Sequence, residues 1–251
     1  MFFASNNKRN RHRHRKLIWQ ERAGTETMKR TKIEITLEEF PRELHGILKN
    51  ANVYDSSCGS PAQVLYSDAG YYIKIAKKGQ LKREAEMASL FERKGIGAKV
   101  EAYLSEDRDY LVTESARGED GTNHLSDPEK LCGELAKAMK LLHSIPVTDL
   151  PISPCMETYA ELVSEKKMKQ DTLIHGDFCL PNVMLDDWKF SGFIDTGLAG
   201  VGDRHIDLYW VLWSLQYNLK TDRYTDYFID LYGRDQVDRE ILKKVAEREH
   251  G

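Results

Sequence analysis

The sequence lacks any apolar run near the 18 or so residues that a membrane-spanning helix needs. It has only four cysteines in 251 residues, and they are widely scattered. They form neither the paired spacing of a zinc site nor the framework of a disulfide-rich secreted domain. These absences predict a protein of a reducing, cytoplasmic compartment with no membrane partner.

Internal repeats, low-complexity tracts and the P-loop pattern are also missing. The loop Ser56–Pro61 is rich in small residues, and such a loop between strands can bring backbone N–H groups close to a phosphate. Most loops of this kind are simply turns. Hydrophobic residues make up 41% of the chain and charged residues 31%, as in ordinary globular proteins. The length is sufficient for one large domain or two lobes.

The net charge of −3 conceals an uneven distribution. Residues 1–30 contain nine Lys or Arg and two acidic residues, so residues 31–251 contain 28 basic and 38 acidic residues and carry −10. An acidic body argues against a nucleic-acid partner and weakly favours a cationic small-molecule substrate.

Residues 1–27 include the strongly basic stretch from Arg9 to Lys16. Three interpretations are open: an arm for nucleic acid or a membrane surface, a targeting sequence, or a disordered extension without function. Leu17–Trp19 is too short for the apolar part of a signal peptide, and we favour the disordered extension. Met28 directly precedes a strand-like segment and is a candidate functional start.

The most informative segment runs from His175 to Asp195. Residues 183–185 and 190–194 are apolar and flank the turn-like residues 186–189, a pattern that predicts a β-hairpin. In a hairpin the start of the first strand lies beside the end of the second. Asn182 and Asp195 are therefore expected to lie together, with Asp177 on the loop just before them.

Two carboxylates and an amide oxygen at one edge suit Mg²⁺, which binds few protein ligands and leaves room for phosphate oxygens. The arrangement is typical of a phosphoryl-transfer loop. Asp177 is the better candidate for a catalytic base because it lies in the loop, whereas His175 follows the apolar Leu173–Ile174 and is expected to be structural. Each residue alone has a simpler explanation, since Asp and Asn commonly form turns.

Residues 32–112 predict a small, sheet-rich lobe. Lys74 lies between Ile73 and Ile75 in a strand and points to the opposite face. Glu84 lies on the apolar stripe of a helix predicted over 80–94, where an unpaired carboxylate is costly. We expect Lys74 and Glu84 to form an ion pair; an exposed, unpaired Glu84 is the alternative.

The remainder of the chain is predicted to be mostly helical, with helices over 126–143, 156–168, 207–215, 222–232 and 238–247. A small sheet lobe, 28–115, followed by a helical lobe, 116–251, is an α+β architecture. Residues Glu114–Gly118, which include Ser115 and Ala116, form a plausible hinge between the lobes. His143 is expected to act as a C-terminal cap.

With these motifs the chain resembles the aminoglycoside phosphotransferases, which are bacterial antibiotic kinases with a two-lobe, protein-kinase-like fold. The resemblance covers roughly residues 40–250. It is strongest in His175–Asp177 with Asn182, in Ser191–Gly197 and in Gly200–Leu208, and it is closest to the 3′-hydroxyl kanamycin and neomycin kinases.

The resemblance implies Mg²⁺-dependent phosphorylation of an aminoglycoside by ATP, with GTP possible, and antibiotic resistance as the result. Asp177 would be the catalytic base, and Asn182 and Asp195 would hold Mg²⁺. Lys74 would contact the nucleotide phosphates, oriented by Glu84.

The resemblance also implies that Ser60 would cover the phosphates and that the backbone near Ser115 and Ala116 would hold the purine. Asp207 would support the catalytic loop. We expect a monomer.

Two departures from the family pattern stand out. Leu198 replaces an Arg that often follows the Asp-x-Gly element, and only 31 residues separate His143 from His175, where the 3′-kinases carry extra helices. Two alternatives therefore stay open: a kinase of another small alcohol, such as a macrolide, choline or a sugar, or a nucleotide-binding homologue with impaired transfer.

Overall fold

The computed structural model describes residues 30–57 and 62–250, and within them the chain forms two compact units. The first comprises the described residues up to Glu92 together with Ala98–Ser115, and the second comprises Arg93–Gly97 together with the described residues from Ala116 onward. The expected extension, residues 1–27, and Ser60 lie outside the described residues. No helix among the described residues is both long enough and apolar enough to span a membrane.

The first unit is built on a six-stranded antiparallel sheet with the order β1-β2-β3-β4-β6-β5. The strands are β1 (Thr31–Ile33), β2 (Val53–Asp55), β3 (Gln63–Ser67), β4 (Tyr71–Lys77), β5 (Val100–Ser105) and β6 (Arg108–Glu114). Strands β3 and β4 form a hairpin around Asp68–Gly70, and β4 continues the sheet by pairing with β6.

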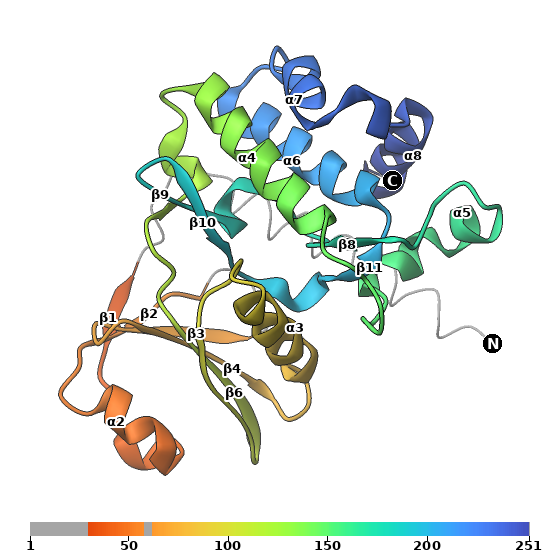
Figure 1. The fold of residues 1–251 in the computed structure, drawn as a ribbon. Coiled ribbons are helices and arrows are strands. Elements are labelled where there is room, and N and C mark those ends of the chain that lie inside the picture. Colours follow the sequence, from red (N-terminus) through yellow and green to blue (C-terminus); the bar gives the residue numbers. More distant parts are fainter. Residues whose placement is uncertain (1–29, 58–61, 251) are drawn as a thin grey trace. The chain divides into compact units, whose positions relative to one another are not determined.

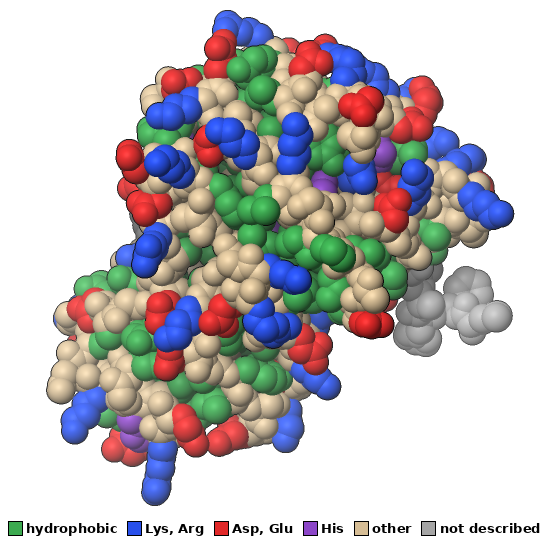
Figure 2. Space-filling model, viewed as in Figure 1, with side chains coloured by type: hydrophobic (Ala, Val, Ile, Leu, Met, Phe, Trp, Pro, Cys, Tyr) green, Lys and Arg blue, Asp and Glu red, His purple; other side chains and the backbone are tan. Residues whose placement is uncertain are grey.

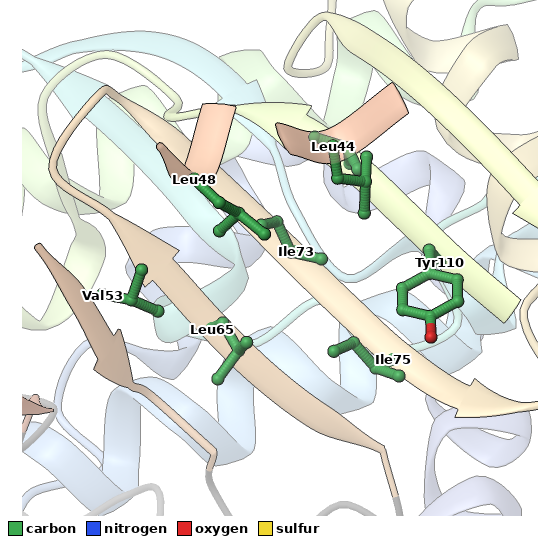
Figure 3. Packing of buried hydrophobic residues seen from close by; sticks show 8 residues of the cluster. Leu44, Leu48, Val53, Leu65, Ile73, Ile75 and Tyr110 are labelled. Atoms are coloured by element: carbon green, nitrogen blue, oxygen red, sulfur yellow. The ribbon is translucent and has the colours of Figure 1, made fainter. Parts of the chain in front are cut away.

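The two faces of this sheet carry separate cores. On one face Leu65, Ile73, Ile75 and Tyr110 pack with Leu44 and Leu48, as Figure 3 shows. Leu48 belongs to the short helix α2 (His45–Leu48) and Leu44 to the 3-10 turn η2 (Arg42–Leu44), and Leu37 of the 3-10 turn η1 (Leu37–Glu39) packs against the same core. Helix α3 (Lys82–Arg93) packs on the other face. The period of two along β4 thus sends Ile73 and Ile75 into one core and leaves Lys74 for the side of α3.

The second unit combines small sheets with helices. One sheet has the order β10-β9-β7 and the other pairs β11 with β8. Their strands are β7 (Glu119–Asp120), β8 (Thr172–Ile174), β9 (Val183–Asp186), β10 (Lys189–Phe193) and β11 (Gly200–Gly202). The helices are α4 (Pro128–His143), α5 (Ala160–Ser164), α6 (Arg204–Leu219), α7 (Thr225–Tyr232) and α8 (Arg239–His250), with 3-10 turns η3 (Gly121–His124), η4 (Pro154–Tyr159), η5 (Leu180–Asn182), η6 (Thr196–Leu198) and η7 (Arg234–Gln236).

Helix α6 is the centre of this unit. Ten of its residues are buried, and α4, α7 and α8 all pack against it (Figure 1). Helix α4 begins two residues after the predicted start at 126. Asp127 is its N-cap and accepts a hydrogen bond from the backbone N–H of Lys130 at 3.1 Å, and Pro128 is the first helical residue.

The helix predicted over 156–168 is shorter in the structure. Residues Pro154–Tyr159 form a 3-10 turn, and only Ala160–Ser164 are α-helical. Lys166 then adopts a left-handed conformation with φ of 56°, which ends the helix. The apolar residues here include no repeat long enough to sustain several turns.

The predicted hairpin is confirmed: β9 and β10 pair antiparallel, with Phe193 opposite Val183. Both residues at its tip, Asp187 and Trp188, have positive φ, the geometry of a two-residue turn that normally selects Asn and Gly. The indole of Trp188 meets the ring of His124 edge-on at 4.8 Å, and the ammonium of Lys130 lies 4.6 Å from its centroid. These contacts offset part of the backbone strain.

We expect Gly118→Ala to destabilise the protein by more than about 3 kcal/mol, because backbone overlap adds to the strain of positive φ. Gly118 has φ of +82°, and a Cβ there would lie 2.0 Å from the carbonyl oxygen of Leu185 in β9. Urea unfolding measures the effect.

The matched control is Gly133→Ala in α4, where a Cβ would meet nothing within 4 Å. It should stabilise the helix by about 0.5–1 kcal/mol. Equal unfolding midpoints for the two variants would contradict this account of the Gly118 turn.

The surface of the described chain mixes both signs of charge. On the face that Figure 2 shows, acidic and basic side chains are interspersed with small apolar areas, and no large field of one sign appears there.

Candidate functional site

The hairpin brings Asn182 and Asp195 together, as its pattern predicts. The backbone N–H of Ile194 donates to the carbonyl oxygen of Asn182 at 3.1 Å. Asp195 directly follows Ile194 in the chain and therefore lies close to Asn182. Asp195 adopts a left-handed conformation with φ of 60° and ψ of 53°. Asp tolerates this region better than most residues, and the conformation turns the chain sharply at the end of the ribbon.

Asp177 joins this pair through the side chain of Asn182. The Asn182 amide nitrogen Nδ2 donates to the carbonyl oxygen of Asp177 at 2.9 Å and to its carboxylate Oδ2 at 3.0 Å. Both side chains are buried, with 5% and 2% exposure for Asp177 and Asn182. Because the amide N–H groups point to Asp177, the oxygen Oδ1 is the atom of Asn182 that can bind a cation.

His175 holds the motif together. It is fully buried, and burial lowers the pKa of its imidazole, so the ring is neutral at physiological pH. Its Nε2–H donates to the carbonyl oxygen of Ile194 at 2.9 Å, which ties the loop after β8 to the residue before Asp195. This geometry agrees with the expected structural role.

Asp207 fixes the same loop from helix α6. Its carboxylate accepts hydrogen bonds from the backbone N–H groups of His175 and Gly176, each at 2.8 Å. It is fully buried, and its third partner is Nε2 of His143, at 3.1 Å. Nδ1 of His143 in turn meets the hydroxyl of Tyr232 at 2.8 Å.

The role expected for His143 was therefore incomplete. It is the last residue of α4, but Ser144 makes the capping bonds, and the His143 side chain bridges Asp207 and Tyr232. Sequence patterns do not reveal this link, because the partners stand 64 and 89 residues away from His143.

In the first unit the expected pair of Lys74 and Glu84 is confirmed. The ammonium of Lys74 donates to both carboxylate oxygens of Glu84, at 2.7 and 2.9 Å. The two side chains are 18% and 13% exposed, so the pair is partly shielded from water. A lysine held in this way presents a fixed positive charge on the α3 side of the sheet.

At the predicted hinge, the backbone N–H of Ser115 is already used, because it donates to the carbonyl oxygen of Gly70 at 2.8 Å. The buried hydroxyl of Ser115 has no hydrogen-bond partner among the described residues. A purine at this segment would therefore be met by the hydroxyl of Ser115 or by the backbone of Ala116. The purine-binding role of both residues stays a prediction.

No cluster of three or more His, Cys, Asp or Glu residues that could hold a metal occurs among the described residues. A site with one carboxylate, Asp195, and one amide oxygen, Asn182, does not need such a cluster. These hard oxygen ligands fit Mg²⁺, which keeps several positions for water and phosphate.

Comparison with known proteins gives the family. Residues 156–242 match the family model described as the phosphotransferase enzyme family. A probable aminoglycoside 3′-phosphotransferase of Lactococcus lactis is 41% identical over 250 residues, which cover 85% of this chain and 95% of that protein. An aminoglycoside 3′-phosphotransferase of Niallia circulans is 30% identical over 54% of this chain and 64% of its own length.

Solved structures share the fold. The crystal structure of an aminoglycoside-3′-phosphotransferase of type VIII has a TM-score of 0.64 and 22% identity, covering 85% of this chain and 98% of that chain. An aminoglycoside phosphotransferase from Streptomyces rimosus, in complex with ADP and streptomycin, also has a TM-score of 0.64, with 18% identity over 86% of this chain and 98% of that chain. The expected α+β, protein-kinase-like architecture is thus confirmed.

Proposed function

The chain belongs to the aminoglycoside phosphotransferases, and we propose that it transfers the terminal phosphoryl group of ATP to the 3′-hydroxyl group of an aminoglycoside, with Mg²⁺ as cofactor. The 3′ position is supported by the names of the related proteins, including the one that is 41% identical. In a bacterium the product would be an inactivated drug, and the protein would confer resistance. We place the reaction in the cytoplasm, where ATP is available.

The hydrogen bonds from Asn182 to Asp177 are the observation that best supports this proposal. They hold one carboxylate for the acceptor hydroxyl and leave an amide oxygen, beside Asp195, for the metal. In our proposal Asp177 orients the hydroxyl and accepts its proton as the bond from its oxygen to the γ-phosphorus forms, while the bond between that phosphorus and the bridging oxygen breaks and ADP leaves. Asn182 and Asp195 would hold Mg²⁺, which when bound would neutralise charge on the nucleotide phosphates.

We propose that the unit that includes β1–β6 binds the nucleotide and that residues 116–251 supply catalysis and the acceptor site. Lys74 would contact the phosphates from a position set by Glu84. ATP and GTP are both compatible with this set of contacts. Most of the rate enhancement would come from positioning and electrostatic stabilisation, as in other phosphoryl transfers.

The short segment 144–174 keeps the second candidate open, a homologue that binds nucleotide but transfers poorly. The segment is nevertheless anchored to α8: Tyr159 donates a hydrogen bond to Glu249, and Arg248 pairs with Glu161. We retain active transfer as the proposal because Asp177, Asn182, Asp195, Lys74 and Glu84 are all present, and each could be lost without unfolding the chain.

The function is tested by incubating the purified chain with Mg²⁺ and ATP and with kanamycin, neomycin, a macrolide, choline or a simple sugar. We expect ADP release above background only with the aminoglycosides. Release with another acceptor alone would assign the chain to a different small-alcohol kinase. Binding of ATP without release in any mixture would favour the impaired homologue.

We expect Lys74→Met to lower kcat/KM for ATP about 100-fold, because the nucleotide loses its fixed cation. Glu84→Gln should lower kcat/KM for ATP about tenfold, since Lys74 stays charged but is less firmly held. Steady-state kinetics with ATP as the varied substrate measures both effects. Lys77→Met, an exposed change in the same strand, is the control and should match the wild type.

A further inference from the structure

The first unit carries a groove that the proposed reaction does not use. It has a volume of about 540 Å³ and lies on the face of the sheet opposite α3, where η1 meets the ends of β3, β4 and β6. Its floor is apolar and includes Ile35, Phe40 and Ile75. Figure 3 shows Ile75 and Tyr110 side by side on this face.

Four carboxylates line the groove. Glu34, Glu38 and Glu39 come from the segment after β1, and Asp107 comes from the turn between β5 and β6. None of them has an ion pair or hydrogen bond within the described part of the chain. Arg108 is the sole positive side chain among the lining residues, so the groove has an excess of negative charge.

Tyr110 provides a second, independent feature. Its side chain is only 4% exposed and lines the groove, yet its hydroxyl has no hydrogen-bond partner among the described residues. The hydroxyl oxygen is not one of the fully buried atoms that lack a partner, so it reaches the open space of the groove. A ligand that supplies an N–H donor in the groove could hydrogen-bond to this oxygen in place of water.

The spacing of the acids argues against a metal ion as that ligand. No group of three or more acidic, histidine or cysteine residues among the described residues lies close enough to hold one metal. The negative charges are therefore spread along the groove over an apolar floor. This combination suits an extended cation whose charged groups are separated by methylene chains.

We propose that this groove binds a linear aliphatic polyamine. The methylene chain lies on the apolar floor, the ammonium groups meet the carboxylates at the rim, and one ammonium donates a hydrogen bond to the hydroxyl of Tyr110. The site is distinct from the residues assigned to phosphoryl transfer, because Lys74 and Glu84 lie on the other face of the sheet.

The probe is spermidine, titrated into the full-length protein at low salt and followed by calorimetry. The groove variant carries Glu34→Gln, Glu38→Gln and Glu39→Gln. This variant loses three partly screened ion pairs with spermidine, so we expect its dissociation constant for spermidine to rise about tenfold or more. The matched control removes three other charges, with Glu129→Gln, Glu240→Gln and Glu247→Gln. It should bind within about twofold of the wild type because none of these residues lines the groove.

A second variant, Tyr110→Phe, keeps every charge and should weaken spermidine about threefold to tenfold, because it removes one hydrogen bond to a charged group. Equal weakening by the two triple variants, or unchanged affinity in Tyr110→Phe, would overturn the proposal. Binding that appears only when the arginines among residues 8–16 are replaced by glutamine would assign the groove to the chain's own basic segment, which also overturns it.

Discussion

Asp177→Asn should lower the rate of phosphoryl transfer at least about 1000-fold, because the variant can no longer accept the proton of the acceptor hydroxyl. The substitution preserves the volume of a side chain that is 5% exposed, and the variant should fold. The nucleotide contacts that we propose involve other residues. The dissociation constant for ATP, measured by calorimetry, should therefore stay within about twofold of the wild type.

The matched control for this prediction is Asp187→Asn, at the exposed tip of the same hairpin. Asn accepts positive φ as readily as Asp, so this variant should transfer phosphate at the wild-type rate. Our assignment of Asp177 would be wrong if its Asn variant kept more than a tenth of the activity while the control behaved as expected.

Asp207→Asn should destabilise the protein by about 2–4 kcal/mol, because a fully buried carboxylate loses its charge and an amide N–H replaces one acceptor. The backbone N–H groups of His175 and Gly176 both depend on that carboxylate. In this variant the loop that carries Asp177 should become more mobile, and transfer activity should fall even at temperatures where the variant is folded.

Urea unfolding measures the change in the free energy of unfolding, and two further variants serve as references. Tyr232→Phe removes the hydrogen bond between the Tyr232 hydroxyl and His143, and it should lower the free energy of unfolding by about 1 kcal/mol. Asp222→Asn, an exposed change before α7, should lie within about 0.5 kcal/mol of the wild type. A midpoint for Asp207→Asn equal to that of Asp222→Asn would show that the buried carboxylate is not what holds the loop.

The parts of the molecule that could be predicted from the sequence depend on short-range patterns. The hairpin of β9 and β10 follows from two apolar segments around a polar turn, and its antiparallel pairing places Asn182 beside Asp195. Lys74 and Glu84 were also predictable, since a strand lysine and a carboxylate on an apolar helix stripe each need a partner.

The parts that were missed depend on contacts between distant segments. Residues 93–97 leave the first unit and attach to β10, where Phe193 donates its N–H to the carbonyl oxygen of Ile96. The chain of hydrogen bonds from Tyr232 through His143 to Asp207 joins three helices. No local propensity encodes these pairings, because they are decided by packing after the elements have formed.

The early end of α5 has a different cause. The residues after Ala160 are acceptable in a helix, but too few apolar positions follow to bury a longer one. The apolar pattern over 156–168 was therefore too short for the length of helix that we predicted.

The most direct test of the central claim is to determine where the phosphate is added. Kanamycin B and 3′-deoxykanamycin B differ by one hydroxyl group, and each is incubated with the full chain, Mg²⁺ and ATP, followed by ³¹P and ¹³C NMR of the product. We expect a monophosphate on the 3′-oxygen of kanamycin B and no product from the deoxy compound. Phosphorylation of both compounds at another hydroxyl, or of neither, would contradict the account.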